Sequence, residues 1–133
     1  MREILFRGKN IHSGEWAIGN YAFRYGSHYI YFPKKPNPYG FDYEYVIPET
    51  VGQYTGLTDK KGTKIFEGDI VKFKWDKWCE FYRYIEFSNG EFLATPVLHS
   101  EDEWSIRICG ENEKLVVIGN IHDNPELMEG GAE

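Results

Sequence analysis

The sequence predicts a mostly β protein (a β-rich α+β fold) in which a small N-terminal antiparallel sheet is joined to a C-terminal, partly open barrel. Short segments of alternating polar and apolar residues recur between turn residues, which is typical of strands. No long segment has the 3.6-residue period of a helix. The aromatic content is 17%, and large aromatic side chains give a chain of 133 residues enough buried area for a β-rich core.

Four strands are predicted in the N-terminal part of the chain. In order, they are segment 3–8, a strand through Trp16 and Ile18 after a turn at Ser13 and Gly14, and segments 27–32 and 43–48. Segment 33–42 has three prolines among its first six residues. Proline fixes φ and removes an amide donor, so we expect a loop there. These strands would form an N-terminal β subdomain, residues 1–48, with a Tyr- and Pro-rich insertion.

The segment "IPETVGQYTGLTDKKGTKIFEGDIVKF", residues 47–73, is rich in glycine and begins the second predicted subdomain, residues 49–133. A single helical turn fits 49–52, and tight turns are expected at 58–64 and 67–69 before a strand at 70–75. Five carboxylates lie beside or near Gly, Pro or Asn. They are Glu49, Asp59, Glu67, Asp69 and Asp123. Short acidic side chains at such positions accept backbone amide hydrogen bonds, so we expect them to shape turns.

The C-terminal part continues the β pattern. Segment 80–98 predicts a hairpin, because two β-rich runs flank Ser88-Asn89-Gly90 and Asn-Gly accepts the positive φ angles of a tight turn. Further strands are predicted in "WSIRIC" and "KLVVIGNI". The segment "DNPELM" predicts one terminal helical turn with proline at its first position.

No pattern in the sequence predicts catalysis. The four histidines have no zinc-type spacing, and there is no nucleophile motif or phosphate-binding loop followed by a helix. Cys79 and Cys109 are 30 residues apart and fit no metal-ligand pattern. We therefore expect no enzyme activity, with no catalytic residues, no cofactor and no metal site.

The net charge is −6, and the acidic residues gather in the second half of the chain. Phosphate repels such a chain, so the charge disfavours nucleic acid as a partner. The N-terminal segment has no apolar core of signal-peptide length, and no segment approaches the ~20 apolar residues of a membrane span. We expect a cytoplasmic protein that does not associate with membranes.

The aromatic segment 21–45 is the strongest candidate for an interaction surface, with ten aromatic residues among 25. The residues selected from it are Tyr21, Arg24, Tyr25, Tyr29, Tyr31, Lys34 and Lys35. Tyrosine favours half-buried strands, which is the structural interpretation of this segment. Rigid, amphipathic tyrosines also make protein contacts, and aromatics mixed with cations stack single-stranded bases. All three interpretations remain open from the sequence.

Three segments resemble signature blocks of the YopX family of phages and prophages. They are "EILFRGKNIHSGEWAIGN", "PETVGQYTGLTDKKGTKIFEGDIVKF" and "VVIGNIHDNPEL", and their order and spacing follow the family over nearly the whole chain. The resemblance implies a YopX-like fold with an SH3-like barrel in the C-terminal half. It also implies a phage or prophage origin in a bacterial host cell.

The resemblance carries over no activity, but it does assign structural roles to the signature residues. Glycines would supply turn conformations at Gly52, Gly56, Gly62 and Gly68. Apolar side chains would fill the barrel at Ile65, Phe66, Ile70, Val71 and Phe73, and Pro125 and Leu127 would hold the last turn against it. Functionally we expect a non-catalytic binding or self-assembly module whose partner is itself, as a homo-oligomer, or a host or phage protein. The alternative is a single-stranded nucleic-acid-binding protein using segment 21–45, and a hydrolase is the less favoured third interpretation.

Overall fold

The computed structural model describes residues 3–33, 41–74, 77, 80–97, 106–108 and 115–129. The chain divides into two compact units, unit 1 (Met1–Tyr54) and unit 2 (Thr55–Glu133). The sequence placed the subdomain boundary after residue 48. None of the helices in the described part of the chain is both long and apolar enough to span a bilayer.

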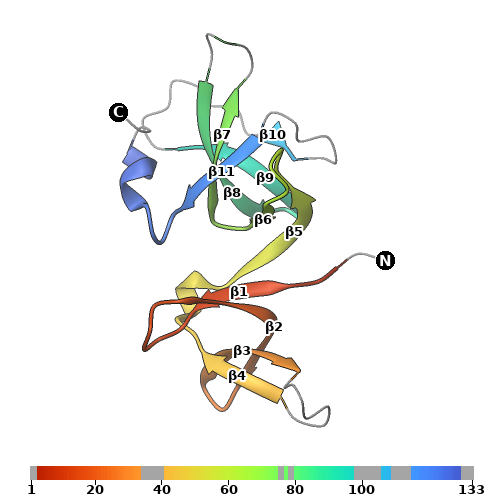
Figure 1. Cartoon of the computed structure of the whole chain (residues 1–133), viewed down its shortest axis with the longest axis vertical. Helices are drawn as coiled ribbons and strands as arrows, with labels where there is room; N and C mark the ends of the chain where they lie inside the picture. Colours follow the sequence, from red (N-terminus) through yellow and green to blue (C-terminus); the bar gives the residue numbers. More distant parts are fainter. Residues whose placement is uncertain are drawn as a thin grey trace. The chain divides into compact units, whose positions relative to one another are not determined.

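Unit 1 is an antiparallel sheet built from hairpins (Figure 1). Its strands are β1 (Phe6–Lys9), β2 (Trp16–Arg24), β3 (Ser27–Pro33) and β4 (Phe41–Tyr45), and a short 3-10 helix η1 (Pro48–Thr50) follows. The start of strand β5 (Gly52–Thr58) pairs with β1, and β5 then continues across the boundary into unit 2. In sheet order, β4, β3, β2 and β1 are neighbours, so β4 is an edge strand.

The core of unit 1 lies on one face of this sheet. Ala17, Ile30 and Val46 are buried there. Gly19 sits under the neighbouring strand, because a Cβ at this position would lie 2.6 Å from the backbone oxygen of Tyr31. Strand side chains alternate between faces, so residues next to the core positions in sequence point to the opposite face.

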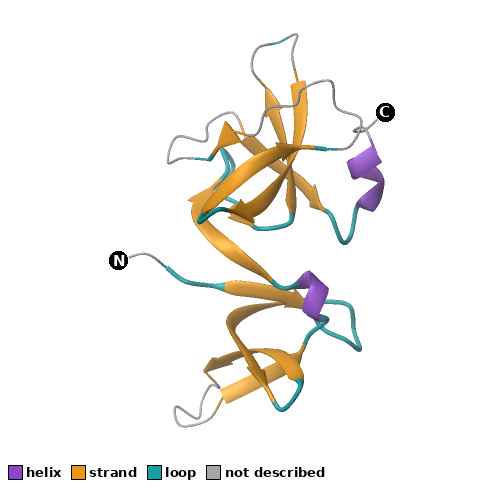
Figure 2. Ribbon diagram, turned by 180° about the vertical axis from the view of Figure 1, so that it is seen from behind, coloured by secondary structure: helices purple, strands orange, loops and turns teal. Residues whose placement is uncertain are grey.

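Unit 2 is built around a five-stranded antiparallel sheet (Figure 2). Its elements are β6 (Lys64–Phe66), β7 (Asp69–Lys74), β8 (Glu80–Ser88), β9 (Glu91–Pro96), β10 (Ile106–Arg107), β11 (Leu115–Asn120) and the 3-10 helix η2 (Pro125–Glu129). The sheet order is β10-β9-β8-β7-β11, and β6 pairs with β5 instead. The end strands β10 and β11 are not paired with each other, so this sheet is not closed into a barrel.

The core of unit 2 contains most of the apolar residues that the resemblance selected. Ile65, Phe66, Ile70 and Val71 are buried, and Phe73 packs against the cluster while remaining partly exposed. The last turn differs from the expectation. Pro125 begins η2 but is exposed, and Leu127 is only half-buried, so η2 contributes no buried residue.

The mostly β prediction is confirmed, with two antiparallel sheets. The hairpin at Ser88-Asn89-Gly90 forms as predicted between β8 and β9, and Asn89 and Gly90 have φ of 51° and 83°. Strand β5 was not predicted, because Gly52 and Gly56 in it read as turn residues. Both belong to the strand, Gly52 as its first residue and Gly56 with a positive φ of 89°, whereas Gly62 and Gly68 lie in turns.

Candidate functional site: a tyrosine pocket in unit 1

The turn between β2 and β3 presents a tyrosine in an unusual backbone conformation. Tyr25 and Gly26 have φ of 51° and 79°, the two positive angles of a tight two-residue hairpin turn. Asparagine is the favoured residue at the first of these positions, and a bulky side chain is rare there. The Tyr25 side chain is 94% exposed, and the Arg24 guanidinium lies 5.4 Å from its ring centroid. Tyr25 therefore carries backbone strain without burying its ring.

Strand register gathers four more tyrosines beside this turn. Tyr29 pairs with Tyr45 and Tyr31 pairs with Tyr43 across β3 and β4. Paired residues point to the same face of a sheet, so all four lie together, and we call this surface the tyrosine face. The ring centroid of Tyr29 lies 6.2 Å from that of Tyr31, 5.8 Å from that of Tyr43 and 6.4 Å from that of Tyr45.

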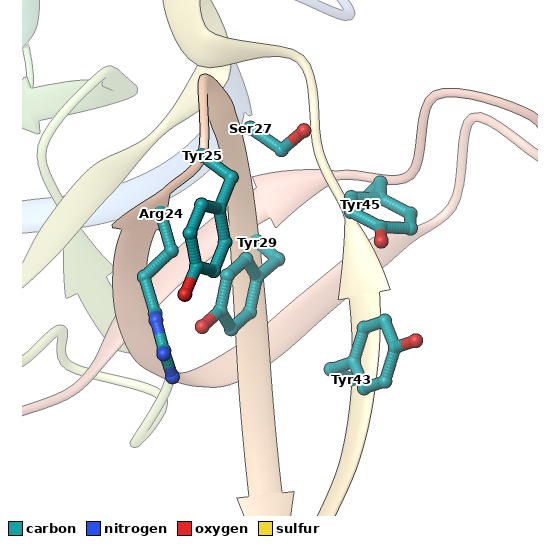
Figure 3. Close-up of a pocket in the computed structure, with 6 residues that line it drawn as sticks. All are labelled: Arg24, Tyr25, Ser27, Tyr29, Tyr43 and Tyr45. Carbon is teal, nitrogen blue, oxygen red and sulfur yellow. The ribbon is translucent and has the colours of Figure 1, made fainter.

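An open pocket of about 290 Å³ lies on this face, and we call it the tyrosine pocket. It is lined by Arg24, Tyr25, Ser27, Tyr29, Tyr43 and Tyr45 (Figure 3). In this view Arg24 and Tyr25 lie to one side of Tyr29, while Tyr43 and Tyr45 lie on its other side. Tyr29 is thus the central ring of a shallow aromatic site with a cation at one margin.

The phenols of the pocket influence each other. Tyr43 and Tyr45 meet edge to face, with ring centroids 5.5 Å apart and planes at 85°. The pKa of the Tyr45 hydroxyl is raised above its usual range, first by the charge that Tyr43 would carry and then by a hydrogen bond with Tyr43. A tyrosine is neutral at physiological pH even at its ordinary pKa, and these neighbours make ionisation of Tyr45 less favourable still.

The described residues of β1 to β4 that alternate onto the tyrosine face include cations but no carboxylate. Arg24 is on this face, and so by register are Arg7 and Lys9, which lie 4.5 Å and 5.7 Å from the ring centroid of Trp16. The acidic residues of β4 alternate with its tyrosines, so Asp42 and Glu44 point to the other face. There Glu44 Oε1 accepts a 2.8 Å hydrogen bond from Asn10 Nδ2.

The structure distributes the residues selected from the sequence over both faces. Arg24, Tyr25 and Tyr29 line the pocket, and Tyr31 lies beside it on the tyrosine face. Tyr21 lies on the opposite face, where its hydroxyl is 2.6 Å from Nδ1 of His28 and its ring packs near Phe6. Lys34 and Lys35 lie outside the described residues.

Sequence reasoning did not select Tyr43, Tyr45 or Ser27 for the site. The signal was present in "FDYEY", because alternation puts both tyrosines of that run on one face. Knowing that they meet Tyr29 required the β3–β4 register, which the composition of the loop between them does not give.

Two of the carboxylates predicted to shape turns, Asp59 and Asp69, accept backbone amide hydrogen bonds. Asp59 Oδ1 accepts hydrogen bonds from the amides of Lys61 and Thr63, and Asp69 Oδ2 accepts one from Phe66. Among the residues that the structure describes, no three His, Cys, Asp or Glu side chains are grouped so that they could hold a metal ion. Cys79 and Cys109 lie outside these residues.

Comparison with known proteins gives a family and a structural neighbour. A sequence model described as YopX protein matches residues 6–129. The crystal structure of protein EF1440 from Enterococcus faecalis is similar with a TM-score of 0.61 and 24% sequence identity, covering 97% of this chain and 100% of that one. At this identity the likeness shows a shared fold. The comparison with curated protein sequences gives no match.

Proposed function

We propose that this chain, which belongs to the YopX family, is a non-catalytic binding or self-assembly module that recognises its partner through the tyrosine pocket. The observation that carries the proposal is the pocket itself, in which four tyrosines and Arg24 surround an open volume of about 290 Å³. Tyrosine and arginine are enriched at the energetic centres of interfaces, since they offer large contact areas with hydrogen-bonding ends.

The exposure and the backbone strain of Tyr25 favour a role in recognition over a role in folding. Its ring is almost fully exposed, so it adds little buried area to unit 1. Its left-handed backbone has an energetic cost that asparagine would reduce. Strain of this kind is concentrated at sites that act on something outside the fold.

Self-assembly would use the tyrosine face instead of the outer edge of β4, where the Tyr45 carbonyl already accepts a 3.0 Å hydrogen bond from the Ile11 amide. Antiparallel pairing of two β4 strands centred on Tyr43 would bring Asp42 of each copy opposite Glu44 of the other. Like charges directly opposite each other destabilise a strand pair, and charged residues are a common protection of sheet edges. In its biological setting, we propose that the module acts in the cytoplasm of a bacterium that carries the phage or prophage.

The test is an affinity pull-down of the tagged chain from a bacterial host lysate, analysed for both protein and nucleic acid, with light scattering on the purified chain. Tyr25→Asn is the test variant and Phe87→Ala is the control, because Phe87 is a half-exposed aromatic residue of unit 2. We expect wild type and Phe87→Ala to recover the same partner or to self-associate, and Tyr25→Asn to lose this. Equal behaviour of all three proteins, or a monomer that recovers nothing, would contradict the proposal.

A further inference from the structure

We propose that the partner of the tyrosine pocket is single-stranded nucleic acid, with a base stacked on its rings and the adjoining phosphate against Arg24. This inference rests on the proposed function, since it names the class of molecule that the same site would bind. Three observations carry it: the arrangement of the rings, the charge of the tyrosine face and the exclusion of cationic ligands by Arg24.

The rings of the pocket suit a planar ligand. The pairs of Tyr29 with Tyr43, Tyr29 with Tyr45 and Tyr43 with Tyr45 have interplanar angles of 62°, 76° and 85°. None of these pairs is a parallel stack, so each contact covers a face of only one of its two rings. The volume is at the lower limit of the roughly 300–1,000 Å³ typical of small-molecule sites, so the pocket fits a single base-sized group.

The charge of this face complements a phosphate backbone. Arg24 is exposed and Lys9 half-buried on it, whereas Arg7 alternates onto it but is buried. No described carboxylate of β1 to β4 lies on this face. The net charge of −6 disfavours nucleic acid for the chain as a whole, but residues 1–54 contain six basic and five acidic residues. Charges further away than the Debye length of about 10 Å are largely screened at 0.1 M salt, so the local cations decide what this face attracts.

Arg24 also argues against cationic ligands as occupants of the pocket. An aromatic site without a cation would suit a quaternary ammonium group or a methylated lysine, but the guanidinium at the margin repels such ligands. Base pairs in a duplex are stacked on each other, so a base must be unstacked to lie on tyrosine. A single strand is therefore favoured over a duplex.

The experiment is fluorescence anisotropy of a labelled oligothymidylate of about eight nucleotides, first at about 50 mM salt. One stacking contact corresponds to about a five- to 150-fold change in affinity, so we expect a weakening in this range for Tyr25→Asn. With Arg24 and Lys9 as phosphate contacts, raising salt to about 200 mM should weaken wild-type binding about sevenfold. Arg24→Gln should reduce the slope of log affinity against log salt by about 0.7, and Phe87→Ala should bind as wild type does.

Three results would overturn the inference. One is the absence of an anisotropy change for wild type at low salt, and another is equal affinity for wild type and Tyr25→Asn. Binding of a duplex of the same length as tightly as the single strand would also overturn it. If the strand does not bind but a protein is recovered in a Tyr25-dependent way, the inference fails and the proposed function stands.

Discussion

Asp59 provides a prediction whose magnitude follows from the structure. Its side chain is 6% exposed, and both carboxylate oxygens accept backbone amide hydrogen bonds. Oδ1 accepts from Lys61 at 2.8 Å and from Thr63 at 2.9 Å, and Oδ2 accepts from Val117 at 2.9 Å. The last bond joins residues 58 positions apart, so this carboxylate connects the turn after β5 to strand β11.

The perturbation is Asp59→Asn. The amide oxygen of asparagine can replace Oδ1 and keep two of the bonds, but its NH₂ group would then face the Val117 N–H, which is also a donor. The variant therefore loses at least one hydrogen bond to a charged group and leaves a part-buried donor unsatisfied. We expect the free energy of unfolding to fall by about 2 kcal/mol, measured by urea denaturation of wild type and variant.

The same group gives a pH dependence. Burial by itself would raise the pKa of Asp59, but the three amide donors outweigh burial and hold this pKa below its ordinary value of 3.8. A lowered pKa contributes stability that is present above 3.8 and is lost as pH falls through the folded-state value. Wild type should therefore lose stability below about pH 4, and Asp59→Asn should lack this component. Equal stability of the two proteins at pH 7, or identical pH profiles, would refute the reasoning.

Three further predictions concern backbone geometry. Gly68 has φ of 91° in the turn before β7, so Gly68→Val should reduce stability by about 2 kcal/mol, and a wild-type melting temperature would contradict this. Gly19→Ala should lower the free energy of unfolding, measured by chemical denaturation, by about 1–3 kcal/mol, because its Cβ would lie 2.6 Å from the Tyr31 backbone oxygen. Unchanged stability of this variant would show that β3 can move away. Tyr25→Asn should raise stability by about 1 kcal/mol, since asparagine tolerates φ of 51° better than tyrosine, and a lower melting temperature would show that the ring supports the fold.

The sequence was informative where local chemistry decides the structure. Asn89-Gly90 specifies a tight turn by its φ preferences, and the turn carboxylate Asp59 is recognisable from Gly62, three residues later. Strand β5 was missed because Gly52 and Gly56 read as turn residues, while pairing with β1 and β6 makes the segment a strand. Local propensity cannot report such a non-local pairing.

The sequence predicted the kinds of residue in the candidate site, but not which of those residues lie on the same face. The aromatic density of segment 21–45 indicated a surface, but which rings share a face depends on strand register. In the observed register, Tyr21 lies on the opposite face beside His28, and Tyr43 and Tyr45 lie next to Tyr29. A shift of one residue in β3 would have reversed these assignments.

The most direct measurement is hydroxyl-radical footprinting of the aromatic side chains, comparing the isolated chain at low concentration with the chain in a bacterial host lysate. If the tyrosine pocket recognises a partner, Tyr25 and Tyr43, which are 94% and 57% exposed, should become protected from oxidation in the lysate. Phe87, 51% exposed in unit 2, should keep its reactivity. Unchanged oxidation of Tyr25 and Tyr43 together with protection of Phe87 would show that recognition occurs elsewhere on the chain.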